Sequence, residues 1–248
     1  MKNTYLLDVL KDQVTPALGC TEPIAVALAV AKAKETLGSF PDKIKIKVDR
    51  NIFKNALAVG IPGTQEKGLH MAVALALVVG KSEYGLEVLK DVTSEDVLKA
   101  KELMKKNIVD ISIADGIVGL YVEVEAFSKS EKSKVVIKDK HDNIVIVQKN
   151  DRAIFEKSET SQNQVSLIQS MKEMYIKDFV EFVDQVDIKD LSLVEKGIEM
   201  NKKIAEAGMT SKYGRALSRG VSIQDMDYKD YAKYLTSVAS FARMSGYP

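Results

Sequence analysis

The residues of this chain best suited to chemistry begin at a loop-to-helix junction. The junction reads Pro16-Ala17-Leu18-Gly19-Cys20-Thr21-Glu22-Pro23 and holds the only cysteine in the sequence. Backbone N–H groups at the start of a helix favour an anion, so we expect a Cys20 thiolate or a metal-bound Cys20 sulfur to be stabilised there. The alternative is that Cys20 is a small buried apolar side chain, which is the commoner role of a single cysteine.

A second group of polar residues follows further along the chain, at Asn51, Lys54 and Asn55. Lys is a point-charge donor and Asn a directional one, so together they suit a carboxylate. The turn Pro62-Gly63-Thr64 can expose backbone amides and a hydroxyl as an anion-binding nest. The alternatives are a solvated helix end for the first group and an ordinary turn for the second.

Two Ala-rich helices must position these residues. Residues 22–37 form an apolar run of helical length that ends before Gly38, and residues 69–79 form a second such run. We expect Thr21 to be the N-cap of the first helix, with Glu22 in its first turn. Both helices are rich in small residues, which permits close packing, so we expect both to be buried.

The remaining pattern predicts an α+β fold. Strictly alternating segments within residues 43–49 and 108–149 predict an antiparallel sheet of about four or five strands, with helices on one face and a Lys/Glu-rich solvated face. Beyond a polar stretch at 157–163 the chain reads as helical, and it is expected to divide into domains at 1–156 and 157–248. The predicted C-terminal helices cover residues 165–185, 190–207, 213–219 and 227–244.

Composition excludes several classes of function. The chain has 248 residues, 46% hydrophobic and 29% charged, with a formal net charge of +1, which is typical of a soluble globular protein and favours neither nucleic acid nor membrane partners. One cysteine fits a reducing compartment, and the polar first residues predict no signal peptide, so we expect a cytoplasmic protein. Phosphate-loop, dinucleotide-binding, serine-hydrolase and zinc-protease motifs are absent from the sequence.

Several separate segments share their order with one known family. They are PALGCTEP at 16–23, NIFKN at 51–55, VGIPGT at 59–64, GLEVLKD at 85–91, HDNIV at 141–145 and ARMSG at 242–246. In these segments the chain resembles the L-cysteine desulfidase family of bacteria and archaea, which is related to the alpha chain of iron–sulfur L-serine dehydratases. The resemblance extends over essentially the whole chain. Members of that family continue beyond it with further cysteines.

The resemblance implies a lyase that uses an iron–sulfur cluster. In such enzymes a [4Fe-4S] cluster acts as a Lewis acid, and the β-substituent of L-cysteine or L-serine is eliminated to give pyruvate, ammonia and sulfide or water. Cys20 matches one cluster ligand. Since cluster proteins supply several cysteines, we expect this chain alone to bind no cluster. We therefore expect it to be the N-terminal part of such a lyase, inactive by itself.

The same resemblance implies roles and partners. Asn51, Lys54, Asn55, Gly63 and Thr64 are expected to bind the small amino-acid substrate. We expect a companion C-terminal portion that completes the enzyme, or a homo-oligomer of this chain, and no nucleic-acid or membrane partner. The alternative function is a non-catalytic module, left from such an enzyme, that binds small amino acids or a partner. The sequence does not distinguish cysteine from serine as substrate.

Overall fold

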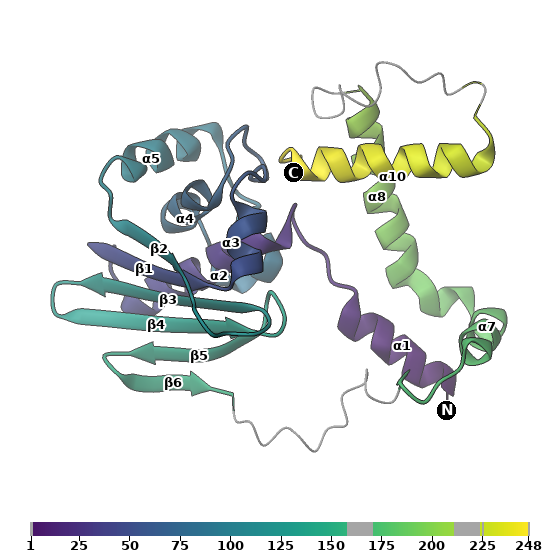
Figure 1. The fold of residues 1–248 in the computed structure, drawn as a ribbon, viewed down its shortest axis with the longest axis horizontal. Coiled ribbons are helices and arrows are strands. Elements are labelled where there is room, and N and C mark those ends of the chain that lie inside the picture. Colours follow the sequence, from purple (N-terminus) through teal and green to yellow (C-terminus); the bar gives the residue numbers. More distant parts are fainter. Residues whose placement is uncertain (1, 158–170, 211–223, 225, 248) are drawn as a thin grey trace. The chain divides into compact units, whose positions relative to one another are not determined.

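The computed structural model describes residues 2–157, 171–210, 224 and 226–247 (Figure 1). The predicted helix at 213–219, and residues 165–170 of the predicted helix before it, lie outside the described residues. The described chain forms two compact units. The larger unit is drawn from residues 17–157 and 204–248, and the smaller from residues 1–16 and 158–203. The predicted division between residues 156 and 157 stays a prediction.

The larger unit is built on one six-stranded sheet with the order β2-β1-β3-β4-β5-β6 (Figure 1). Neighbouring strands are antiparallel except β1 and β2, which are parallel. The strands are β1 (Lys43–Val48), β2 (Val109–Ile113), β3 (Tyr121–Ser128), β4 (Glu131–Lys138), β5 (Ile144–Lys149) and β6 (Arg152–Glu156).

The predicted α+β class is confirmed, with two corrections to the sheet. The sheet has six strands rather than four or five, and it is mixed rather than antiparallel. The chain leaves β1, passes through three α-helices and one 3-10 segment, and returns to run beside β1 in the same direction. A parallel pair needs such a long crossover connection, whereas a short hairpin turn would make the pair antiparallel.

Alternation along β1 sets the two faces of the sheet. Ile44, Ile46 and Val48 are fully buried on the face covered by helices, and the lysines between them are exposed. On the opposite face Glu123 is paired with Lys47 at 3.5 Å and Lys134 at 2.5 Å, in agreement with a charged Lys/Glu face.

Five helical segments lie between these strands or before them. They are α2 (Thr21–Leu37), α3 (Arg50–Ala56), α4 (Leu69–Val78), the 3-10 segment η1 (Ser82–Glu87) and α5 (Ser94–Met104). Both Ala-rich helices, α2 and α4, are mostly buried, as predicted. Small side chains on α2 allow the sheet to approach closely, and the buried Ser133 hydroxyl of β4 donates to the Ala33 carbonyl at 2.7 Å.

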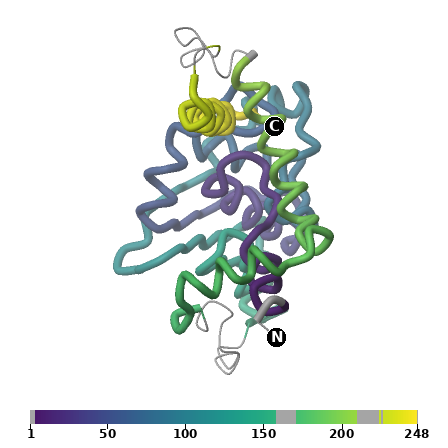
Figure 2. The backbone as a smooth tube through the Cα atoms, turned by 90° about the vertical axis from the view of Figure 1, so that its right-hand side faces the viewer, coloured from purple at the N-terminus to yellow at the C-terminus, as the bar shows by residue number. Residues whose placement is uncertain are grey.

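The C-terminal helix α10 (Tyr228–Met244) completes the larger unit. It packs on the end of α8 (Ser192–Thr210) through a small cluster of Ala205, Tyr234 and Val238. Figure 2 shows α10 almost end-on in yellow, and in both views its C-terminal end lies beside the N-terminal half of the larger unit.

The smaller unit is helical. It contains α1 (Lys2–Gln13), α7 (Ile176–Gln185), the 3-10 segment η3 (Ile188–Leu191) and the first part of α8. Leu6 and Val9 of α1 and Phe182 of α7 are its buried apolar side chains. Within the described residues, no helix combines the length and apolarity needed to cross a bilayer.

Candidate functional site

The loop before α2 packs directly against the turn at residues 60–64. Gly19 has a φ of 72°, and a Cβ at this position would lie 2.4 Å from the Pro62 Cγ atom. Only glycine combines this left-handed backbone with so close an approach. Two of the segments that carry the family resemblance, 16–23 and 59–64, are therefore neighbours in the fold.

The end of α10 reaches the same turn from the far end of the sequence. The Gly60 N–H donates to the Met244 carbonyl at 2.9 Å. Gly246 has a φ of 86°, and a Cβ there would lie 2.9 Å from the Ile61 carbonyl oxygen. A third resembling segment, 242–246, thus joins the first two, and the turn at residues 60–64 is contacted both by the loop before α2 and by the end of α10.

A short chain of hydrogen bonds centred on Glu22 lies at the start of α2. The Cys20 Sγ donates to Glu22 Oε2 at 3.0 Å, and the Asn55 amide donates from α3 to Glu22 Oε1 at 3.0 Å. Cys20 is the N-cap residue of α2, whereas Thr21 was expected there. Cys20 and Glu22 are partly buried, and Asn55 is exposed.

Cys20 is held as a neutral thiol. Burial, together with the hydrogen bond to Glu22 and its negative charge, raises the pKa of Cys20 from 9.0 to about 11. The expectation of a thiolate stabilised by the helix is therefore wrong for this structure. The backbone amides at the start of α2 do lower this pKa, but desolvation and the neighbouring carboxylate outweigh them.

Glu22 is held in the opposite state, as a carboxylate. Desolvation acts to raise its pKa, but the hydrogen bonds from Cys20 and Asn55, with the charge of His141, leave the pKa below its ordinary value. His141 lies in the connection between β4 and β5, within a fourth resembling segment. Glu22 is thus a partly buried anion with a thiol, an amide and an imidazole around it.

The structure separates the predicted substrate-binding residues. Among Asn51, Lys54 and Asn55, the Asn55 side chain alone hydrogen-bonds to the Cys20–Glu22 pair. Asn51 and Lys54 are exposed on the same short helix, α3. Their predicted role stays a prediction.

The turn residues also differ from one another. Thr64 is buried, and its hydroxyl donates to the Ile61 carbonyl at 2.8 Å and accepts from the Glu66 N–H at 3.0 Å. That hydroxyl holds the turn together. Gly63 is exposed with a φ of 73°, and its N–H has no acceptor in the part of the chain that the structure describes. Of the two, Gly63 is the residue that can donate to a ligand.

The donor set around Cys20 does not fit an iron–sulfur cluster. The chain has one cysteine, its thiol is protonated at neutral pH, and a cluster needs several thiolates. Among the described residues, no group of three or more His, Cys, Asp or Glu side chains is placed to hold a metal ion. Coordination of a metal by Cys20 stays a prediction and would first require loss of the thiol proton.

Sequence reasoning missed the central role of Glu22. It treated Glu22 only as an acidic residue of the first helical turn. The available signal was the motif itself, because Cys20 and Glu22 are separated by one residue at a helix start and their side chains can meet there. The contribution of Asn55 to this pair depends on the tertiary fold.

The sequence is similar to several bacterial proteins. It is 49% identical over 244 residues to a UPF0597 protein of Clostridium tetani, and 45% identical over 244 residues to one of Caldanaerobacter subterraneus. It is 38% identical over 252 residues to a UPF0597 protein of Parabacteroides distasonis. Each match covers 98% of this chain, which spans 58% of the length of these relatives. No family model and no solved structure matches the chain.

These relatives correct the functional prediction. The proteins that match nearly all of this chain are named UPF0597 proteins, and none of these three names is that of a lyase. The prediction of the N-terminal part of an iron–sulfur lyase, or of a module left from one, is therefore wrong. The structure agrees with this correction, since the one cysteine of the chain is a thiol hydrogen-bonded to Glu22 and not one of several cluster ligands. The resemblance of the short segments to the desulfidase family stays a prediction.

Proposed function

We propose that the Glu22 carboxylate anchors the ammonium group of a small free amino acid. The observation that carries the proposal is the Cys20–Glu22–Asn55 chain of hydrogen bonds, which holds an ionised, partly buried carboxylate at a fixed position. The proposal concerns binding by this chain and includes no cluster and no elimination reaction.

Glu22 keeps the capacity to accept further hydrogen bonds. An ionised carboxylate has about four acceptor sites, and each Glu22 oxygen receives one side-chain donor in the structure. An ammonium group is a compact cation with three donors, so it suits the remaining sites. Partial burial reduces screening by water and strengthens this attraction.

The carboxylate of the same ligand needs donors of its own. Gly63 supports this part of the proposal because it is exposed and its turn packs on the loop that carries Cys20. Lys54 adds an exposed cation on the helix that carries Asn55. An amino acid carries an ammonium group and a carboxylate on the same carbon, so a site with one anion and nearby donors favours it over a simple amine or acid.

Isothermal titration calorimetry with L-serine, and with L-cysteine under reducing conditions, tests the proposal. We expect saturable binding that Glu22→Gln weakens about tenfold or more, because a charged hydrogen bond contributes roughly 1.5 kcal/mol or more. The matched control is Glu35→Gln, on the same helix, where the Glu35 carboxylate accepts from the Ser82 N–H at 2.7 Å.

Comparison of ligands sharpens the test. L-Lactate has the carboxylate of L-serine but no ammonium group, and we expect it to bind far more weakly. Equal binding of L-lactate and L-serine, or unchanged L-serine binding in Glu22→Gln, would contradict the assignment of Glu22. If none of the ligands gave a binding signal, the result would contradict the proposal that this chain binds a small amino acid.

We further propose a cytoplasmic location, because a single thiol without a disulfide partner is suited to a reducing compartment. A homo-oligomer or a companion protein remains a prediction, which sedimentation velocity over a range of concentrations would test.

A further inference from the structure

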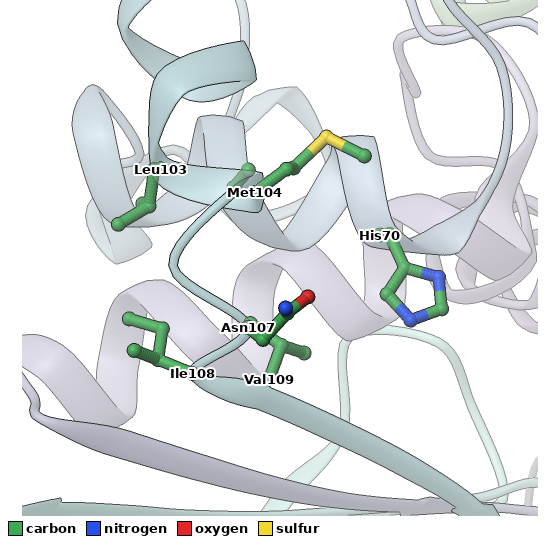
Figure 3. Close-up of a pocket in the computed structure, with 7 residues that line it drawn as sticks. His70, Leu103, Met104, Asn107, Ile108 and Val109 are labelled. Carbon is green, nitrogen blue, oxygen red and sulfur yellow. The ribbon is translucent and has the colours of Figure 1, made fainter.

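A concave site lies away from Glu22, between α4, the end of α5 and the start of β2 (Figure 3). It is a cavity of about 190 Å³. Its apolar walls include Leu103 and Met104 of α5, together with Ile108, which precedes β2, and Val109, the first residue of β2. Two polar side chains, those of His70 and Asn107, also line it.

Local sequence explains why the chain makes a hollow here. The last turn of α5 closes with the Lys106 N–H donating to the Leu103 carbonyl at 3.0 Å. Asn107 then adopts a φ of 51°, a left-handed conformation that asparagine tolerates better than most residues. This residue turns the chain abruptly from the helix into the edge strand β2, so Ile108 and Val109 are only partly covered.

The polar side chains of the cavity are available to a ligand. His70 and Asn107 are exposed, and within the described residues neither side chain has a hydrogen-bond partner. In Figure 3 the Asn107 amide lies between the His70 ring and the apolar walls. An amide offers both donors and an acceptor, and a neutral imidazole offers one of each. The cavity therefore combines apolar walls with donors and acceptors on one side.

We propose that this cavity binds a small aromatic molecule with one uncharged hydrogen-bonding head group. The volume is below the roughly 300 Å³ of sites for drug-sized ligands, and cavities of about 150 Å³ are known to admit a benzene ring. A single ring with a small head group is thus the size that fits. The Met104 sulfur favours an aromatic ring over an aliphatic one, because thioethers make favourable contacts with ring edges.

The probe for this proposal is benzamide, which has one ring and an amide that both donates and accepts. The measurement is NMR on protein labelled at the methyl groups of Met, Ile, Leu and Val. We expect the Met104, Ile108 and Val109 methyl signals to shift saturably, with a dissociation constant on the order of 1 mM, as befits so small a ligand. Acetamide, which lacks the ring, is expected to cause no saturable shift.

Variants separate the cavity from nonspecific binding. His70→Ala combined with Asn107→Gly should weaken benzamide binding about tenfold, since both head-group partners are lost. Both residues are exposed, and glycine accepts the left-handed backbone, so the fold should persist and the methyl spectrum will show it. The matched control is His141→Ala, which removes the other histidine of the chain and should leave benzamide binding unchanged.

Three results would overturn the proposal. The first is no saturable shift of these methyl groups up to about 20 mM benzamide, well above the expected dissociation constant. The second is equal binding of acetamide. The third is unchanged affinity in the His70→Ala, Asn107→Gly double variant. None of them would affect the proposed role of Glu22, which is tested with different ligands and a different variant.

Discussion

The Cys20 thiol donates a hydrogen bond to the Glu22 carboxylate, with 3.0 Å between Sγ and Oε2. The two groups fix each other's protonation states. The thiol keeps its proton because burial disfavours a thiolate and because that thiolate would face a carboxylate, whereas the carboxylate stays ionised because the thiol and Asn55 donate to it. The pair is therefore an anion with a neutral donor beside it, which suits binding of a cation better than nucleophilic attack.

Low reactivity of the cysteine follows from this pairing. Alkylation by iodoacetamide should rise with pH around a midpoint near the Cys20 pKa of about 11. Glu22→Gln removes the negative charge beside the sulfur, and we expect it to lower that pKa and to accelerate alkylation at pH 8 about tenfold, which corresponds to one pKa unit. Glu35→Gln should leave the rate unchanged. A wild-type midpoint at or below the ordinary pKa of 9.0 would contradict the pairing.

The same thiol makes stability depend on alkaline pH. The pKa of Cys20 is higher in the folded protein than in the unfolded chain, so its contribution is fully present below pH 9.0 and is lost as pH rises toward about 11. Cys20→Ser lacks an ionisable group in this range. We expect the difference in unfolding free energy between wild type and Cys20→Ser to change across that window, measured by urea unfolding at several pH values. A pH-independent difference would be the contrary result.

Glu22 should make the stability of the fold depend on pH in the acidic range. Its pKa is lowered in the folded state, so its contribution is present above the ordinary value of 4.5 and is lost as pH falls through the folded pKa. Glu22→Gln should therefore unfold with a weaker dependence on pH below 4.5 than the wild type. Thermal unfolding between pH 3 and 6, a range of roughly one to two units either side of that value, makes the comparison. Identical pH profiles would argue against an ionised Glu22 in the fold.

Packing of the loop before α2 is tested at Gly19. Gly19→Ala places a Cβ 2.4 Å from Pro62 Cγ at a φ of 72°, so overpacking adds to backbone strain. Gly116 has a φ of 75° and open space around it, so Gly116→Ala introduces the backbone strain without overpacking. We expect a loss of about 1 kcal/mol for Gly116→Ala and about 1–3 kcal/mol more for Gly19→Ala, measured by urea unfolding. Equal losses would show that the contact with Pro62 is absent.

Contact between the sheet and α2 is tested at Ser133. This buried hydroxyl donates to the Ala33 carbonyl, and Ser133→Ala leaves that carbonyl without the donor. We expect a loss of about 1 kcal/mol in unfolding free energy. Ser130 is exposed in the turn between β3 and β4, so Ser130→Ala is the matched control and should be close to neutral. A neutral Ser133→Ala would mean that the hydrogen bond contributes nothing.

Periodicity allowed much of the fold to be predicted. The Ala-rich runs became α2 and α4, and the alternating stretch after residue 42 became β1. β6 was not predicted because all five of its residues are exposed. A strand without a buried face need not show alternation of apolar and polar residues. The parallel pairing of β1 and β2 depends on how the helices between them cross the sheet, which strand patterns alone do not reveal.

The sequence predicted which residues belong to the site but not which partners they contact. A helix start favours a thiolate in isolation, but the outcome at Cys20 depends on burial and on the neighbour two residues later. Asn55 was selected for its amide, yet its partner in the fold is Glu22. Thr64 was selected for its hydroxyl, which the fold uses inside the turn. Residue type identified the groups, and tertiary contacts assigned their partners.

Glu22 is the residue that we propose receives the ammonium group of a small amino acid. The most direct measurement is the ¹³C chemical shift of the Glu22 side-chain carboxyl during titration with L-serine, assigned through the loss of the signal in Glu22→Gln. We predict a saturable shift with L-serine and none with L-lactate, while the Glu35 carboxyl stays unchanged. A Glu22 signal that does not move with L-serine, or that moves equally with L-lactate, would contradict the account.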